Sequence, residues 1–562
     1  MKAKKESSKG EAMSGVLPKR CRGVLWQLVL VALLPVFWGI TSDRAAKAEE
    51  SAGAQVRYYL DEATGDDNNS GTAAAQAWKT LAKVNSGQYG PGDAILIKAG
   101  TRYTGQLAPK GSGEKVRPII VDQYGEGPKP RIDAAGSYKE ALLLRNQDYW
   151  QVNNLELTNK GEQEQRYRYG VRVSAWDYGV MKGIELRNLY IHDVNGSNVK
   201  EDHAEGHGIL WEMGGEEKSR FDGLVIEGCH LVRTDRNAIG GFCGYPSREF
   251  GPFGEKGKGW AGSTGVIVRG NLLEDFGGDG IKTWGCDGCL VEYNRAYKGR
   301  QRSKDYAAGI WPWACTNTLI QFNEVSGMKG TMDGQSFDSD GFCRNTIFQY
   351  NYSHDNDGGF MLICCDNWGT IIRYNISQND KERLFHISHR WENTGWKNTR
   401  IYHNVFYIGP GEDVLGVLYT AGVLEDVSFC NNIFYADGKM IMLGLRGQDK
   451  DDGTFAYQAG APPGQKAEEI FSHNAYFGNI SEIPHDPGAI NDDPRLVNPG
   501  GGGKGMKTLE GYKLRQGSPG IQAGIEIQDK SVRDFWGNPV KAGTKPDIGV
   551  HAYSGKYGNG EK

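Results

Sequence analysis

A short sequence phrase recurs through the second half of this chain. In each copy, β-branched and aromatic residues lead to an Asn, more apolar residues follow, and a Gly- or Asp-rich turn ends the phrase. The intervals between the seven asparagines are 23, 29, 28, 24, 29 and 28 residues. This period is too short for a strand-helix-strand unit with a full helix and suits one coil of a β-solenoid. The asparagines are Asn271, Asn294, Asn323, Asn351, Asn375, Asn404 and Asn432.

The repeated Asn has a physical reason to recur. At one corner of successive coils, its amide can satisfy backbone groups of the turn and stack on the next Asn. Weaker copies at Asn154 and Asn188 extend the pattern toward the N-terminus. Although 562 residues would by length suggest three or four domains, the repeat predicts one elongated domain over 49–555 and a short tail over 556–562.

The first 48 residues have the composition of an export signal. A basic segment at 19–22 precedes an apolar run over 24–40, and the small residues at 46–48 suit a signal peptidase. An uncleaved membrane anchor is the alternative, which Pro35 and the small-residue site disfavour. We therefore expect a bacterial protein that is secreted, periplasmic or on the cell surface, with no stable membrane insertion after cleavage.

Composition narrows the class of partner. The formal net charge is only -4 and the body of the chain has no Lys/Arg block, so we expect no nucleic-acid partner. The 14 Trp and 27 Tyr instead suit sugars, whose apolar C–H faces stack on aromatic rings. We expect a carbohydrate partner and a monomer.

Ten cysteines occur, and removal of Cys21 with the export signal leaves nine. An odd number excludes complete pairing within one chain. Most of the cysteines lie in or just after strand-like runs, so we interpret them mainly as buried small residues, with one or two disulfides left open. Their spacing matches no standard zinc site, and no metal site is predicted.

Three carboxylates stand within eight residues in the segment 327–343: Asp333, Asp338 and Asp340. If Phe337 points inward, strand alternation places Asp338 and Asp340 together on the outer face, with Asp333 on the preceding turn. Neighbouring like charges raise one another's pKa, which can keep one carboxyl protonated beside an ionised one. An Asp/Gly-rich solvated turn or a calcium site is the plain alternative.

Aligning neighbouring coils by their asparagines gives this segment its neighbours. With Ile281, Ile310, Phe337, Phe360 and Phe385 as the inward stack, the outward stack contains Lys282, Trp284, Trp311, Trp313, Asp338, Asp340, Met361 and His386. His389 and Arg390 follow on the same coil as His386. We predict Lys282, Trp284, Trp311, Trp313, His386, His389 and Arg390 as substrate-binding residues. The tryptophans could instead pack under a loop, and the histidines could be ordinary surface residues.

Three features together resemble the pectate-lyase-like right-handed parallel β-helix superfamily. These are the Asn-corner repeat, the first segment of the mature chain (strand-like residues at 58–60 and a turn at 65–72) and the C-terminal Asp547-Ile548-Gly549. The resemblance implies an all-β fold, a single-stranded right-handed parallel β-helix with an N-terminal helical cap, which we place at 73–84. It also implies a polysaccharide-active enzyme that is a hydrolase, a lyase or a C5-epimerase.

Paired Asp residues on a central strand and its preceding turn resemble the arrangement in β-helix glycoside hydrolases of the lacto-N-biosidase and β-xylosidase kinds. The match favours Asp333 and Asp340 as catalytic residues, with Asp338 as an alternate, and needs no cofactor. In the lyase or epimerase alternative, Lys282, His386 or Arg390 removes a C5 proton from a uronate and calcium neutralises its acid group. A non-catalytic carbohydrate-binding solenoid is the third hypothesis.

Overall fold

The computed structural model describes residues 55–200, 204–245, 262–364, 366–388, 398–419, 426–449, 455–459, 470–527, 533–541 and 543–555. They belong to one compact unit that begins at Gln55. The expected export signal at 1–48 and the tail at 556–562 lie outside the described residues, so the predicted domain boundaries stay predictions. No helix in the described ranges is long and apolar enough to cross a membrane.

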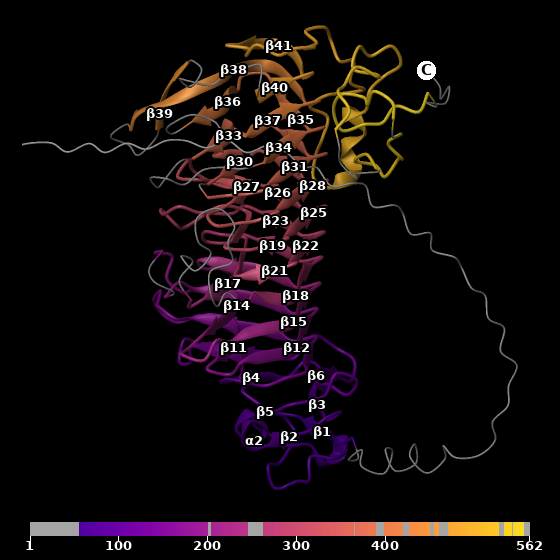
Figure 1. Ribbon diagram of the computed structural model, residues 1–562. Coiled ribbons are helices and arrows are strands. Elements are labelled where there is room, and N and C mark those ends of the chain that lie inside the picture. Colours follow the sequence, from indigo (N-terminus) through magenta and orange to yellow (C-terminus); the bar gives the residue numbers. More distant parts are fainter. Residues whose placement is uncertain are drawn as a thin grey trace, which may run out of the picture. The chain divides into compact units, whose positions relative to one another are not determined.

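The chain winds into a column of stacked coils, and parallel strands of successive coils form three ladders along it (Figure 1). Ladder A contains β1 (Arg57–Leu60), β3 (Ala94–Lys98), β6 (Ile119–Tyr124), β9 (Trp150–Asn153), β12 (Val180–Arg187), β15 (Arg220–Glu227), β18 (Ser263–Arg269), β22 (Leu290–Glu292), β25 (Leu319–Gln321), β28 (Ile347–Gln349), β31 (Ile371–Arg373), β34 (Thr399–Tyr402), β37 (Val427–Cys430) and β40 (Phe471–Ser472).

Ladder B contains β4 (Arg102–Thr104), β7 (Arg131–Asp133), β10 (Glu156–Asn159), β13 (Tyr190–Val194), β16 (His230–Thr234), β19 (Leu272–Glu274), β23 (Arg295–Tyr297), β26 (Glu324–Ser326), β29 (Tyr352–His354), β32 (Ile376–Gln378), β35 (Val405–Ile408), the first part of β38 (Ile433–Asp449) and β41 (Ala475–Ser481).

Ladder C contains β8 (Glu140–Arg145), β11 (Tyr169–Trp176), β14 (His207–Gly214), β17 (Asn237–Cys243), β20 (Ile281–Trp284), β24 (Ile310–Trp313), β27 (Gln335–Ser339), β30 (Gly359–Ile363), β33 (Glu382–Ile387), β36 (Asp413–Tyr419) and the second part of β38. Three short strands lie off these ladders: β2 (Gln88–Tyr89) pairs with β5 (Lys110–Gly111), and β21 (Cys286–Asp287) pairs with β18. The strand β39 (Phe455–Ala459) is antiparallel to β38.

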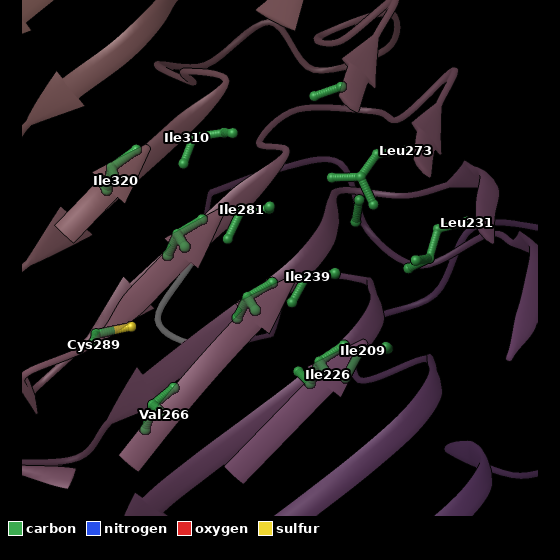
Figure 2. Close-up of a cluster of buried hydrophobic side chains, with 14 of the residues drawn as sticks. Ile209, Ile226, Leu231, Ile239, Val266, Leu273, Ile281, Cys289, Ile310 and Ile320 are labelled. Atoms are coloured by element: carbon green, nitrogen blue, oxygen red, sulfur yellow. The ribbon is translucent and has the colours of Figure 1, made fainter. Parts of the chain in front are cut away.

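The core lies inside the column, where alternate residues of all three ladders point inward. Figure 2 shows Ile239 and Ile281 from ladder C, Val266 from ladder A and Leu231 and Leu273 from ladder B converging there. Because parallel strands repeat about every 4.8 Å, each inward residue packs on the equivalent residues of the coils above and below. The register therefore fixes which side chains reach the outer face. The predicted parallel β-helix is confirmed.

A ladder of asparagines runs through the corner after ladder A. Asn323 represents it: its side-chain oxygen accepts bonds from the backbone N–H and side-chain NH₂ of Asn294, both at 3.0 Å. Its own NH₂ donates to the Val291 carbonyl at 2.9 Å and to the Asn351 side chain at 3.1 Å. All seven predicted asparagines are fully buried, and Asn474 extends the ladder by one coil. The prediction of a stacked Asn corner is confirmed.

The earlier copies at Asn154 and Asn188 were assigned to the wrong position. Each lies one residue before the corner, in the left-handed region with φ of 56° and 51°, where later coils have Gly270, Tyr293 or Phe322. The corner itself is a buried leucine or cysteine in these coils, such as Leu189. Asn tolerates the left-handed conformation, which explains why it occurs there for a different reason.

The predicted helix over 73–84 is two short helices, η1 (Ala74–Gln76) and α2 (Leu81–Ser86). The residues between them do not continue the helix, because Trp78 forms a parallel bridge to Leu60 and stacks on Tyr58 at 5.0 Å. Leu81 and Val84 of α2 are buried in the main core cluster at the N-terminal end of the column (Figure 1). The helical cap is thus confirmed in place and is shorter than predicted.

The C-terminal segment packs against the outer side of ladder B. A second hydrophobic cluster includes Leu509 and Tyr512 of η4 (Met506–Tyr512) and Ile548 of the segment after it. These residues pack with Tyr352 and Ile376 of ladder B. The backbone N–H of Gly505 also donates to Glu324 at 2.9 Å. This face of the later coils is therefore covered by the chain itself.

Eight cysteines lie in the described part of the chain, and seven of them are buried. Cys286, Cys315 and Cys343 follow one another on successive coils at the corner after ladder C, where the Cys315 sulfur accepts the Cys286 N–H at 3.4 Å. Their interpretation as stacked small residues is confirmed, and no disulfide forms among the described cysteines.

Candidate active site

The outer face of ladder C brings the predicted residues together in two rows. In the register, Lys282 pairs with Trp311 and Trp284 pairs with Trp313. The next coil follows in step because Ile310 pairs with Phe337. Asp338 then pairs with Leu362, and Leu362 with His386. Lys282, Trp311, Asp338 and His386 therefore share one outward row.

One member of the predicted outward stack was wrong. Phe337 pairs with Met361 rather than with Phe360, so Met361 points inward and is fully buried in the core cluster. Leu362 takes the outward position. Counted back from the following Asn, Phe337 (14 residues before Asn351) and Met361 (14 residues before Asn375) occupy the same position, in agreement with this register.

Asp338 and Asp340 lie close together at the end of β27. One carboxylate oxygen of each and the Cys364 sulfur all lie within 4.8 Å of one another. This is the one group among the described residues whose spacing could hold a metal ion. Asp338 is 3% exposed, and its Oδ1 has no hydrogen-bond partner in the described part of the chain. Burial, followed by the charges of Asp340 and Asp333, raises the pKa of Asp338 well above its usual range.

Asp333 reaches the same site from the turn before β27. Its backbone has a φ of 60° and forms a parallel bridge to Ala307 of the preceding coil. Burial raises the pKa of Asp333 to about 6, and the charge of Asp340 acts in the same direction. The nearby cations Lys200 and Arg383 oppose this rise. Two carboxyls with raised pKa values, Asp333 and Asp338, beside the charge of Asp340 are the electrostatic pattern of acid–base sites.

Trp311 is held beside the carboxyls by a buried ion pair. Its indole N–H donates to Asp279 at 2.9 Å, and Asp279 pairs with the Arg236 guanidinium at 3.3 Å. The ammonium groups of Lys282 and Lys200 lie 5.8 and 5.6 Å from the centre of the Trp311 ring system. Burial lowers the pKa of Lys282. Trp311 is itself 5% exposed, so most of its surface already packs against the protein.

The second outward row is aromatic. Phe242 and Trp284 are 5.5 Å apart, Trp284 and Trp313 are 5.8 Å apart, and Trp313 and Phe342 are 5.8 Å apart. Phe342 comes two residues after Asp340, so the strip ends beside the carboxyls. Trp284, Trp313 and Phe342 are partly exposed. Such a strip can stack on the apolar face of a sugar chain.

His386 is buried in the outward row, two coils beyond Asp338. At about 4.8 Å per coil, its backbone is about 10 Å from that of Asp338. His389 and Arg390 lie outside the described residues, so their predicted role in substrate binding stays a prediction.

Several residues of the site were not predicted from the sequence. They are Lys200, Asp279, Phe342, Cys364 and Arg383. Asp279 stands in the run Gly277-Gly278-Asp279-Gly280, an Asp/Gly turn directly before the strand of Lys282 that could have been noticed. Lys200 lies between β13 and β14, far earlier in the sequence, and carries no local pattern that would identify it.

Comparisons with known proteins agree with this geometry. No protein-family model matches the chain. A lacto-N-biosidase of Bifidobacterium longum subsp. longum is 28% identical over 635 aligned positions, which cover 93% of this chain and 38% of the relative. The chain thus spans about two fifths of the length of the curated relative it matches.

Among solved structures, the native GH136 lacto-N-biosidase of Eubacterium ramulus superposes with a TM-score of 0.56 at 28% identity, covering 70% of this chain and 69% of that one. Its selenomethionine derivative gives a TM-score of 0.57 at 28% identity, over 71% and 70% of the two chains. The resemblance to β-helix carbohydrate-active enzymes is confirmed. The similarity extends beyond the fold to sequence, over most of the column.

Proposed function

We propose that this protein is a glycoside hydrolase whose catalytic pair is Asp333 and Asp340. The observation that carries the proposal is the convergence of the Asp333 turn and the Asp338–Asp340 strand end beside Trp311 and Trp313. An outer sheet face has no structural use for three clustered carboxyls, two of which have raised pKa values. Similarity to two lacto-N-biosidases supports the hydrolase class.

In this mechanism one carboxyl of the pair donates its proton to the glycosidic oxygen as the bond from that oxygen to the anomeric carbon breaks. The second carboxylate either attacks the anomeric carbon or takes a proton from the water that attacks it. In the first case, water then cleaves the glycosyl ester and the first residue takes up the proton of that water. Both routes add one water across the glycosidic bond.

The spacing of the carboxyls limits which pair can work by which route. An inverting pair needs about 6.5–9.5 Å between its carboxyl groups to hold a water, and a retaining pair about 5–5.5 Å. One oxygen of Asp338 and one of Asp340 lie within 4.8 Å of each other, which is closer than the spacing of an inverting pair. An inverting mechanism would therefore have to use Asp333. The burial of Asp338 also favours it as a neutral neighbour rather than as a member of the pair.

The proposed substrate is an oligosaccharide that carries a lacto-N-biose unit, by analogy with the relatives. The aromatic strip from Phe242 to Phe342 offers the stacking surface that a neutral sugar chain requires. Catalysis by this route needs only side chains, and calcium remains the cofactor to test. We also propose that the protein is exported and acts as a monomer.

Product analysis tests the hydrolase. Purified protein would be incubated with a lacto-N-biose aryl glycoside and a panel of neutral and uronic glycans, with and without a calcium chelator. Mass spectrometry should find water-added products that persist in chelator, and Asp333→Asn and Asp340→Asn should each lower kcat by about a thousandfold. A Ser326→Ala variant on ladder B serves as the control.

Other products would redirect the proposal. Unsaturated uronates that absorb in the ultraviolet and require calcium would overturn the hydrolase in favour of a lyase. Binding without any product across the panel would favour a carbohydrate-binding solenoid. Size-exclusion chromatography, and N-terminal sequencing of exported protein, would test the oligomeric state and the cleavage after residue 48.

A further inference from the structure

Arg383 is a buried cation that reaches the catalytic turn from two coils away. It lies at the start of β33 and its side chain is 1% exposed. Its Nη2 donates to the Thr331 carbonyl at 3.0 Å and to the Asp333 carbonyl at 3.3 Å. Both acceptors are main-chain atoms of the turn that carries the Asp333 carboxyl.

Gln335 completes this contact. With its amide oxygen directed toward Arg383, Gln335 accepts from Nη2 at 3.0 Å and from Nε at 3.2 Å, and its NH₂ donates to the Asp333 carbonyl at 2.8 Å. The opposite orientation would leave donors facing donors. The guanidinium thus binds the turn on both sides of Asp333 in the forked geometry that only arginine provides.

The coil between Arg383 and the turn is built to let the two meet. Gln335 pairs with Gly359, and the same register places Gly359 beside Arg383. A Cβ on Gly359 would lie 1.6 Å from the Arg383 carbonyl oxygen, and one on Gly358 would lie 1.8 Å from the Asp333 carbonyl oxygen. The intervening coil therefore has no side chain at either point, and Arg383 spans about 10 Å of ladder to reach the turn.

We propose that Arg383 is a positioning residue of the active site, which fixes the left-handed turn at Asp333 and thereby aims the Asp333 carboxyl at the substrate. The inference rests on the proposed hydrolase function. Asp333 has a φ of 60°, a conformation that a non-glycine residue keeps only when its surroundings hold it. Arg383 supplies that constraint through the two carbonyls and Gln335.

The positive charge of Arg383 also acts on the Asp333 carboxyl, and it opposes the rise in pKa caused by burial. The charged groups that act on Asp333 from the packed elements are Lys200, Asp279, Arg300, Asp338, Asp340 and Arg383. Removal of the Arg383 charge should therefore raise the pKa of Asp333. Whichever limb of the pH–rate profile reports Asp333 should move to higher pH.

Three variants separate positioning from general stability. Arg383→Gln removes both the guanidinium hydrogen bonds and the positive charge. Arg383→Lys keeps the charge and loses the paired guanidinium hydrogen bonds. Arg373→Gln is the control, which removes an arginine elsewhere in the molecule. Arg373 is also buried and donates to Gln349 at 2.9 and 2.7 Å, but it lies on ladder A, away from the site. The readouts are kcat, KM, the pH profile and hydrogen exchange of the amides in 331–335.

Arg383→Gln should lower kcat about a hundredfold, since a displacement of the carboxyl by about 1 Å has an effect of that size. Its KM should change about twofold or less, and its Asp333 limb should move to higher pH. Arg383→Lys should show the loss in kcat without the shift of the limb. Exchange in 331–335 should accelerate in both variants and stay unchanged in Arg373→Gln.

A wild-type kcat in Arg383→Gln, or an equal loss in Arg373→Gln, would overturn the inference. Should the wild-type protein hydrolyse no glycan, the proposed function fails, but the exchange measurement still decides the positioning role. Accelerated exchange confined to 331–335 would then support it, and unchanged exchange would refute it.

Discussion

The Asn corner and the carboxyl site gather like residues in different ways: the corner stacks one buried Asn per coil, whereas the site brings three aspartates together on one coil, in β27, directly after it and on the turn before it. An amide carries a donor and an acceptor, so each Asn satisfies the next, and Asn323 uses both ends of its side chain. Ionised neighbouring carboxylates offer Asp338 no donor and their charges raise its pKa, and its Oδ1 has no partner among the described residues. Stacked amides therefore satisfy one another's hydrogen bonds, whereas clustered carboxyls raise one another's pKa, as at Asp333 and Asp338.

Breaking the amide ladder should have the largest effect on stability. Asn323→Ala removes the acceptor of two Asn294 donors, the backbone N–H and the side-chain NH₂. It also removes the donor to the Val291 carbonyl, and the corner that holds these groups is fully buried. We expect the free energy of unfolding to fall by on the order of 3 kcal/mol. Chemical denaturation followed by tryptophan fluorescence measures this change.

The matched control is Asn317→Gly, which removes an exposed asparagine whose side-chain oxygen accepts from Asn345 at 3.1 Å. Glycine keeps the left-handed φ of 54° at this position. The control should change stability by about 0.5 kcal/mol or less. Equal losses in the two variants would mean that burial of the amide ladder adds nothing.

The buried Asp380 inside the column allows a direct test of a carboxyl against an amide at the same position. Asp380 is fully buried and accepts from the Ser353 hydroxyl, from the Ser377 hydroxyl at 2.6 Å and from the Asn356 side chain at 2.8 Å. Burial nonetheless raises the pKa of Asp380 to about 6. The folded protein therefore holds this proton over a pH range in which the unfolded chain releases it.

The contribution of Asp380 to stability is complete below pH of about 4 and is lost as the pH rises to about 6, a fall of about 3 kcal/mol. Asp380→Asn should remove this fall, because an amide can accept from Asn356 and donate to both serine hydroxyls. Denaturation at pH 4, 5, 6 and 7 tests it. Asp333, whose pKa is also about 6, leaves a residual slope in the variant. A variant with the wild-type slope would show that Asp380 does not titrate there.

The aromatic strip should affect binding more than chemistry. Trp313→Leu removes the ring that contacts both Trp284 and Phe342, and we expect KM to rise about tenfold with little change in kcat. Trp536→Leu, in the C-terminal segment, is the control and should leave KM unchanged. An unchanged KM in Trp313→Leu would assign the strip to packing alone.

The sequence predicts those parts of this molecule that repeat. The Asn period identifies the coils, and strand alternation from Phe337 places Asp338, Trp311 and Lys282 in one outward row. Contacts across unequal coils are not predictable in this way. The prediction placed Phe360 at the position that the register gives to Met361. Arg383 contacts the Asp333 turn across two coils. This contact depends on the length of the arginine side chain and on the absence of a side chain at Gly358 and Gly359 between them.

The smallest expected effect distinguishes the three carboxyls. Asp338 is buried, and burial and the neighbouring carboxylates hold its pKa well above the usual range, which favours its protonated, neutral form. An asparagine is also neutral and has nearly the same shape. Asp338→Asn should therefore lower kcat by only about threefold or less, whereas the same exchange at Asp333 or Asp340 removes a group that transfers a proton or attacks in the proposed mechanism. Parallel measurement of kcat in the three Asp→Asn variants decides the point. A thousandfold loss in Asp338→Asn would place Asp338 in the catalytic pair, and the approach of its carboxyl to within 4.8 Å of Asp340 would then favour retention of configuration.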